Sequence, residues 1–133
     1  MTISLADNLR SARADQITVA RDAGAGPGAI RIYTGPRPAK GGAPTLLLGE
    51  LNFADPSSPA AVAGVLTANA IVGDTSADNT GIAAWFREVD SNGLFVLDGD
   101  CGLSGSDLNL NKLDITAGLP IDITSYVWTE GNN

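Results

Sequence analysis

The stretch that decides the fold is IAAWFREVDSNGLFVLDGD, residues 82–100. It contains two segments rich in β-forming residues, Ile82 to Val89 and Leu94 to Asp100, with a short polar stretch between them. Asn92-Gly93 in that polar stretch is among the strongest short signals for a tight β-hairpin turn. The stretch therefore predicts two antiparallel strands that are joined by a turn.

The first of these predicted strands has apolar residues on both faces. Side chains alternate between the two faces of a strand, so Ile82, Ala84 and Phe86 share one face. Trp85 and Val89 lie on the other. A strand with two apolar faces needs a cover on each side, and we expect the second cover to be the N-terminal helix or another chain.

Further short segments with strand-like patterns lie on both sides of the hairpin. The predicted strands are residues 29–33, 45–51, 64–72, 108–111 and 120–128. The chain also has 16 Gly and 7 Pro residues, which favour many turns between short elements. Several short strands with turn signals between them favour a sandwich or a barrel, so the expected fold is mainly β.

The residues before the first predicted strand favour one helix. Its apolar stripe is narrow and recurs at steps of three and four residues: Leu5, Leu9, Ala12 and either Gln16 or Ile17. The opposite side carries charged residues: Asp7, Arg10, Arg13 and Arg21. Ser4 is the expected N-cap, and the Gly- and Pro-rich residues 24–28 end the helix. The predicted organisation is an N-terminal helix or arm over residues 1–24 and a β domain over residues 25–133.

Composition narrows the classes of function. The 133-residue chain has 8 Lys and Arg against 15 Asp and Glu, a net charge of −7, so we expect neither nucleic-acid binding nor docking on anionic membranes. No apolar run approaches the roughly 20 residues of a membrane-spanning helix, and the early Asp7 argues against a signal peptide. The single cysteine, Cys101, cannot form an internal disulfide, which fits synthesis in a reducing compartment.

The chemistry-bearing residues do not form a recognisable catalytic or metal site. The chain has no histidine, the commonest general base, so Cys101 has no histidine to activate it. Oxygen ligands of the kind that calcium uses occur at Asp98-Gly99-Asp100 and at the pair Asp74 and Asp78. Neither group has the spacing of a twelve-residue calcium loop. The favoured interpretation is that these residues form turns. The glycines of residues 24–28 follow a helix, so they do not form a phosphate-binding loop. We therefore expect no enzyme, no cofactor and no metal.

Motifs spread along nearly the whole chain carry a family resemblance. They are Leu9-Arg10 to Ile17, Arg31 to Gly35 with Arg37-Pro38, Asp74 to Asp78, Ala84 to Arg87, Val89 to Gly93, Asp98 to Asp100, Ser104 to Asn111, and Ala117-Gly118 with Ile121 to Ser125. With these motifs the chain resembles small structural proteins of tailed bacteriophages. The resemblance implies a capsid decoration, or cement, protein: a β-sandwich of the jelly-roll type with one N-terminal helix, bound to the outer surface of the virion capsid after synthesis in the bacterial cytoplasm.

The expected partners are the major capsid protein and further copies of the same chain, as a homodimer or homotrimer. The residues expected at the partner interface are Leu5, Leu9, Ile17, Arg37, Lys40 and Trp128. One alternative is a structural protein of the phage tail, neck or fibre attachment. Another is a carbohydrate-binding β-sandwich, in which Trp85, Tyr126 or Trp128 stacks on sugar rings.

Overall fold

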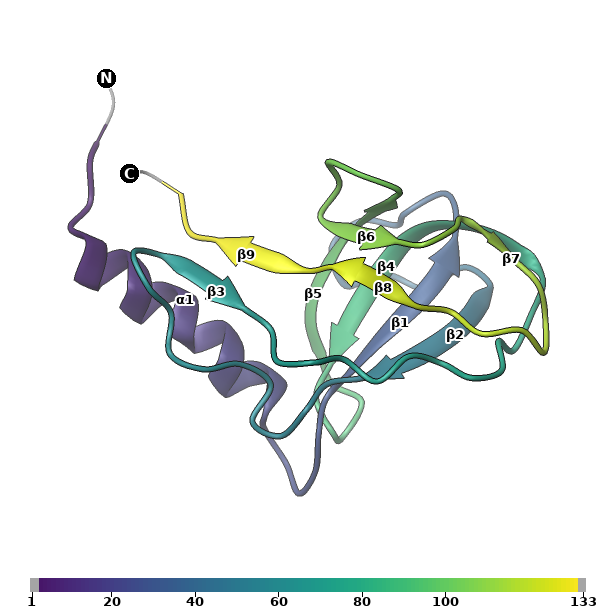
Figure 1. Cartoon of the computed structure of the whole chain (residues 1–133), viewed down its shortest axis with the longest axis horizontal. Helices are drawn as coiled ribbons and strands as arrows, with labels where there is room; N and C mark the ends of the chain where they lie inside the picture. Colours follow the sequence, from purple (N-terminus) through teal and green to yellow (C-terminus); the bar gives the residue numbers. More distant parts are fainter. Residues whose placement is uncertain (1–2, 132–133) are drawn as a thin grey trace.

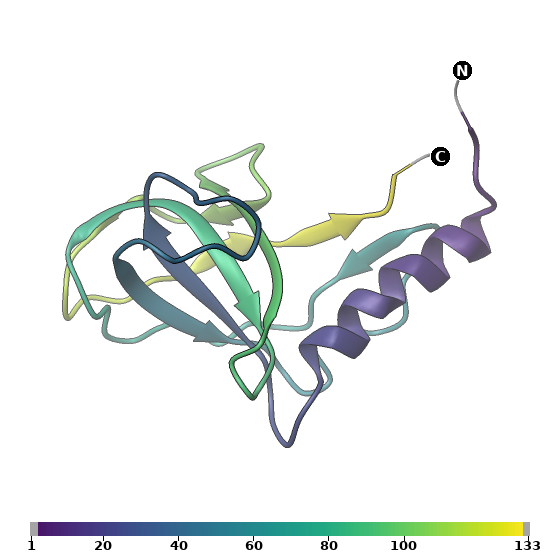
Figure 2. The same ribbon diagram turned by 180° about the vertical axis from the view of Figure 1, so that it is seen from behind.

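The computed structural model describes residues 3–131, which form a mainly β protein with one helix and nine strands (Figures 1 and 2). The helix is α1 (Asp7–Arg21). The strands are β1 (Ala29–Thr34), β2 (Leu47–Asn52), β3 (Val65–Thr67), β4 (Gly81–Val89), β5 (Phe95–Gly102), β6 (Leu108–Leu110), β7 (Asp114–Ile115), β8 (Ile123–Ser125) and β9 (Val127–Thr129). The mainly β class predicted from the sequence is thus confirmed.

Seven of the described strands form one curled sheet. Its order is β2-β1-β4-β5-β6-β8, and β7 pairs with the start of β4 beside this path. All neighbours are antiparallel except β5 and β6, which pair in parallel at Cys101 and Gly102. The curl brings β6 and β8 back across β1 and β4 (Figure 1). The sheet therefore has an inner face that it encloses and an outer face.

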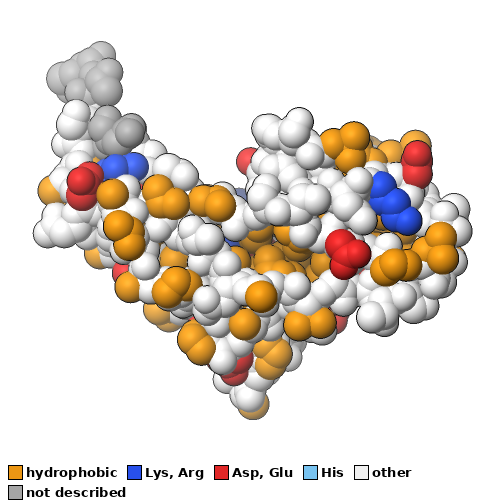
Figure 3. All heavy atoms as spheres, in the orientation of Figure 1, with side chains coloured by type: hydrophobic (Ala, Val, Ile, Leu, Met, Phe, Trp, Pro, Cys, Tyr) orange, Lys and Arg blue, Asp and Glu red, His pale blue; other side chains and the backbone are white. Residues whose placement is uncertain are grey.

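The helix and the two remaining strands form a projection that we call the arm. It consists of α1 and the antiparallel pair β3 and β9. Both ribbon views show the arm standing off from the curled sheet (Figures 1 and 2). In the space-filling view the molecule is hollowed between the arm and the sheet, and hydrophobic side chains lie in the hollow (Figure 3).

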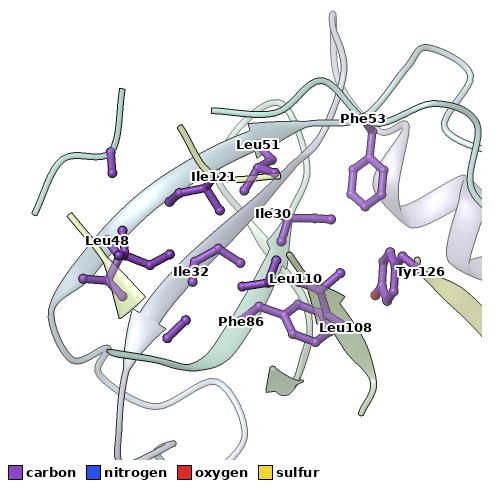
Figure 4. Packing of buried hydrophobic residues seen from close by; sticks show 13 residues of the cluster. Ile30, Ile32, Leu48, Leu51, Phe53, Phe86, Leu108, Leu110, Ile121 and Tyr126 are labelled. Atoms are coloured by element: carbon purple, nitrogen blue, oxygen red, sulfur yellow. The ribbon is translucent and has the colours of Figure 1, made fainter. Parts of the chain in front are cut away.

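The core fills the inner face of the curled sheet. Its fully buried members come from strands on both sides of the curl: Ile30 and Ile32 of β1, Leu48 and Leu51 of β2, Phe86 of β4, Leu108 and Leu110 of β6, and Ile121 just before β8 (Figure 4). Burying an aliphatic or aromatic side chain of this size stabilises a fold by about 1.5–3 kcal/mol. The core therefore holds the sheet in its curled form.

The predicted hairpin of residues 82–100 is confirmed as β4 and β5. In its turn, the Asp90 carboxylate accepts the backbone N–H of Asn92 at 2.8 Å and of Leu94 at 3.0 Å. Gly93 has φ +80°, a left-handed conformation that glycine adopts readily. The strands predicted at residues 29–33 and 108–111 are also confirmed, as β1 and β6.

We expected the N-terminal helix or another chain to cover the second face of β4. In the structure, Trp85 and Arg87 on this face contact β1 and the segment that joins β1 to β2. Trp85 on this face stacks on Tyr33 with ring centroids 4.5 Å apart. Its Nε1–H donates to the Thr34 carbonyl at 2.8 Å and to Thr45 Oγ1 at 2.9 Å. The Arg87 guanidinium on the same face donates to the Gly42 carbonyl at 3.0 Å. The chain therefore supplies its own cover.

The predicted orientation of the helix is wrong. Leu9 of the expected buried stripe is 49% exposed, whereas Arg10, Ala14 and Arg21 are buried. The physical reason is that Arg10 and Arg21 find acceptors inside the fold, as described below. The expected N-cap is also wrong, because the N-cap is Ala6, which makes no side-chain capping bond, instead of Ser4.

Two of the predicted strands differ from the structure in extent. Residues 120–128 were expected to form one strand, but they divide at Tyr126 into β8, which pairs with β6, and β9, which continues to Thr129 and pairs with β3. Residues 64–72 form only the short strand β3. In both cases the alternation of apolar and polar residues is a local property of the sequence. Where each strand begins and ends is set by its pairing partner, which is distant in the sequence.

Candidate partner-binding surfaces

The arm is fixed to the curled sheet by a buried polar cluster. Arg21 at the end of α1 lies 2.7 Å from the Glu88 carboxylate of β4, and both side chains are almost fully buried. The Tyr126 hydroxyl donates a short hydrogen bond to the same carboxylate. The Arg21 guanidinium also lies over the rings of Phe53, at 4.8 Å, and Tyr126, at 5.3 Å. A buried ion pair with additional hydrogen bonds fixes the orientation of the groups that form it.

The electrostatics of this cluster indicate a structural role. Burial, followed by the charge of Glu88, raises the pKa of Tyr126 well above its ordinary value. The phenol therefore stays protonated and keeps its hydrogen bond to Glu88. The side chains of Arg21 and Glu88 are 1% and 0% exposed, so the ion pair is shielded from solvent.

Within the arm, polar contacts join the helix to the ribbon of β3 and β9. Arg10 donates to the Glu130 carbonyl at 2.9 Å, and Arg13 forms an ion pair with the Glu130 carboxylate at 2.8 Å. The backbone N–H of Glu130 donates to the Gly64 carbonyl at 2.9 Å, and that of Gly64 donates to Ser11 Oγ at 3.0 Å. These contacts satisfy the charged groups that the helix turns inward.

The outward surfaces of the arm carry large apolar side chains. On the ribbon, Val65 and Val127 are 37% and 48% exposed, whereas Leu66 on the opposite face of β3 is buried. On the helix, Leu9 and Val19 are 49% and 63% exposed. Figure 3 shows hydrophobic side chains along the arm. Exposed apolar side chains on a projecting part of a protein are candidates for an interaction site.

A second candidate surface follows the edge of β5 that faces the arm. A pocket of about 490 Å³ lies between the loop residues Arg37 to Lys40 and residues 95–98 of β5. A pocket of about 330 Å³ lies between residues 97–99 of β5 and residues 126–129, with Phe86 and Asp107 in its wall. We call these the outer and the inner pocket.

The charge on the surface is negative because nearly every cation is paired. Six of the eight Lys and Arg residues form ion pairs with six different carboxylates, in the part of the chain that the structure describes. Lys40 and Lys112 do not. Nine carboxylates have no cationic partner among residues 3–131, and nine against two lysines gives the net charge of −7. The surface therefore favours a partner with basic groups.

The residues predicted for the partner interface fall into two groups. Leu5, Leu9 and Ile17 belong to the helical side of the arm, where Leu9 is exposed and the other two are half-buried, and Trp128 is half-buried on β9. Arg37 and Lys40 belong to the loop that lines the outer pocket, where Arg37 pairs with Asp100 at 3.4 Å. The structure thus brings Arg37 and Lys40 together but separates them from the helical residues.

Sequence reasoning missed several exposed apolar residues. Val19 continues the expected apolar stripe of the helix by one step, so the sequence pattern could have identified it. No sequence pattern could have identified Val65 and Val127 as exposed. Their exposure depends on the pairing of β3 with β9, which are about 60 residues apart. Phe95 and Leu97 were expected in a strand, but nothing local marks the edge of β5 as unpaired.

The residues considered for metal, nucleophilic or sugar-stacking chemistry have structural environments. Burial, together with the charges of Asp100 and Asp107, raises the pKa of the Cys101 thiol to about 12. Asp74 accepts backbone N–H groups of Glu50 and Ser76 at 3.0 and 2.9 Å, and no group of three or more metal-ligating side chains occurs among residues 3–131. Of the aromatic residues considered for sugar stacking, Trp85 and Tyr126 are buried.

No helix among the described residues has the length and apolar character needed to cross a membrane. Comparison with protein-family models, with curated proteins and with solved structures finds no match to this chain.

Proposed function

We propose that this protein is a capsid decoration protein of a tailed bacteriophage, which binds the outer surface of the shell and stabilises contacts between major capsid protein subunits. The observation that carries the proposal is the arm, which stands off from the sheet and exposes apolar side chains on both its helix and its ribbon. Such a projection offers surface that a partner can cover.

Two further features support the proposal. The motifs that resemble small phage structural proteins extend from the helix to β8. The excess of unpaired carboxylates suits the outside of a particle, since a protein lining packaged DNA needs basic groups. The jelly-roll sandwich that the resemblance implies is part of the proposal: the curled sheet buries one core between β1, β2 and β4 on one side and β6 and β8 on the other.

The mechanism is adhesion without turnover. Each copy buries modest apolar surface of its arm against the shell, while the buried cluster of Arg21, Glu88 and Tyr126 holds the arm in a fixed direction. Many copies that bind the same shell add their contacts through multivalency. The shell then withstands a higher internal pressure before its subunits separate.

The first experiment measures the copy number of the protein in purified phage particles by quantitative mass spectrometry against the major capsid protein. Hundreds of copies per particle support decoration. A dozen or fewer copies overturn it and favour the neck, tail or fibre attachment. Absence from the particle removes the whole phage-structural proposal.

A second experiment tests the arm directly. We expect the triple variant Val19→Ser, Val65→Ser and Val127→Ser to lose binding to particles from which the native protein has been stripped. The matched control is Val72→Ser with Leu103→Ser, two side chains that are 62% and 59% exposed outside the arm. Equal binding of both variants would show that the arm is not the contact surface.

A further inference from the structure

Besides the short strands β7 and β8, which have one partner strand each, the longer strand β5 leaves most of one edge unpaired among residues 3–131. β5 pairs with β4 from Phe95 to Asp100, but it pairs with β6 only at Cys101 and Gly102. No other strand among residues 3–131 pairs with β5. The edge of residues 95–99 that faces the arm therefore has no strand partner for its backbone groups.

The opposite edge of the same sheet is protected. Beside β2, the backbone of Asn52 pairs with Val72, and the Leu48 carbonyl accepts the backbone N–H of Asp78 at 2.7 Å. The Asp74 carboxylate accepts the N–H of Glu50 at 3.0 Å. Natural sheets cover their edges in this way to prevent unwanted pairing. Compared with the edge of β2, the edge of β5 is left open over a longer stretch of strand.

Hydrogen bonding shows which amides of β5 point outward. The Asp100 N–H donates to the Asp107 carboxylate at 2.9 Å, so this N–H faces away from β4. In an antiparallel pair, alternate residues point their N–H groups to the same side. The N–H of Asp98 therefore also faces the open edge.

The two pockets lie on either side of this edge. Leu97 and Asp98 line both of them, so the outer and inner pockets meet at the middle of the open strand. A strand added to the edge would send alternate side chains into the two pockets. Backbone hydrogen bonds then supply affinity and the pockets supply specificity, the usual division in peptide recognition by strand addition.

The charges in the two pockets decide what kind of strand fits. Asp107 lies in the wall of the inner pocket, whereas Arg37 and Lys40 line the outer one. A second copy that paired its own β5 here would place inner pocket beside inner pocket and outer beside outer. Asp107 would then meet Asp107 on one face. On the other face Lys40 would meet Lys40, since Arg37 is paired with Asp100. Like charges opposite each other destabilise a strand pair.

We infer that the open edge of β5 accepts an extended segment of a protein partner, which adds a strand to the sheet. The segment carries apolar and basic side chains on the face toward Asp107 and polar or acidic side chains on the face toward Lys40. The inference rests on the proposed function for the identity of the partner, a shell subunit. The edge itself is a property of the isolated protein.

The probe is a capped seven-residue peptide, acetyl-Lys-Thr-Val-Glu-Lys-Thr-Val-amide, added to the full chain labelled with 15N. We expect saturable changes in the amide resonances of Asp98 and its neighbours, together with slower hydrogen exchange at Asp98. Two comparison peptides are used: one with Lys and Glu exchanged, and one with its central amides N-methylated. The first should bind several-fold more weakly, and the second should not protect Asp98.

A variant pair locates the contact. Asp107→Asn keeps an acceptor for the Asp100 N–H but removes the charge, and should weaken binding of the probe by about two- to fivefold, the factor of an exposed ion pair. Asp114→Asn, on β7 at the other end of β4, should leave it unchanged. Equal affinity for the N-methylated peptide, or no binding of any peptide, would overturn the inference. Peptide binding with a low copy number in particles would instead overturn only the proposed location on the shell.

Discussion

At the scale of single residues, Glu88 is a carboxylate with no exposed surface inside a mainly apolar fold. A buried charge without a partner is costly, and Glu88 is tolerated because Arg21 and Tyr126 both donate to it. The cluster joins three parts of the chain that are far apart in sequence: α1, β4 and the residue between β8 and β9. Its loss should therefore affect the whole protein.

We expect Arg21→Met to lower the free energy of unfolding by about 3–5 kcal/mol, because it leaves Glu88 buried without its cation. The control is Arg31→Met, which breaks the partly exposed pair between Arg31 and Glu50 and should cost about 1 kcal/mol or less. Urea unfolding followed by tryptophan fluorescence measures both. Equal losses would mean that the buried cluster does not hold the arm.

Cys101 makes a second prediction at this scale. A thiol with a pKa of about 12 is far less ionised at pH 8 than one with the ordinary value of 9.0. Since the thiolate is the reactive form, Cys101 should react with a disulfide reagent ~1000-fold more slowly in the folded protein than in urea. Comparable rates in the two states would contradict the buried environment.

At the scale of elements, the hairpin of β4 and β5 depends on the conformation of its turn. Gly93 has φ +80°, and a Cβ placed there would meet only the Arg31 guanidinium at an ordinary 3.9 Å. Gly93→Ala should therefore cost about 1 kcal/mol from backbone strain alone. Gly26→Ala is the control, because Gly26 has no positive φ and open space around it, and it should not destabilise. Thermal unfolding of both variants gives the comparison.

The same element shows what the sequence could and could not predict. Asn92-Gly93 and the flanking apolar residues form a local signal, so the hairpin and its boundaries were predicted within one or two residues. The buried face of α1 was not, because Arg10 and Arg21 are satisfied by acceptors 120 and 67 residues away. The candidate surfaces were predicted only in part, for a related reason. The sequence identifies the loop that carries Arg37 and Lys40. It does not identify the open edge of β5, because that edge depends on how distant strands pair.

At the scale of the whole molecule, the half-buried Cys101 and the buried Tyr126 couple stability to alkaline pH. The pKa values of Cys101 and Tyr126 are both higher in the folded protein than the ordinary values of 9.0 and 10.0, which apply when the chain unfolds. The unfolded chain therefore loses these protons first as the pH rises. Stability from this source is fully present below about pH 9 and falls through the window from pH 9 to 12.

Urea unfolding at pH 8, 9, 10 and 11 should show this decline. Cys101→Ala should remove the part of the slope that begins near pH 9, and Tyr126→Phe the part that begins near pH 10. A stability that rises with pH in this range, or variants with unchanged slopes, would contradict the burial of these two groups.

The pairing of β3 with β9 also determines when the arm can form during synthesis. The helix ends at Arg21, whereas the strand that completes the arm begins at Val127, 106 residues later (127 − 21). At a translation rate of about 5–20 residues per second, the helix emerges from the ribosome roughly 5–20 s before its last partner. A 15-residue helix is marginally stable alone, so the nascent chain carries an unformed N-terminal segment while the β4–β5 hairpin folds behind it. The exposed surface of the arm therefore exists only once Val127 to Thr129 have been synthesised, and a partner cannot engage it earlier.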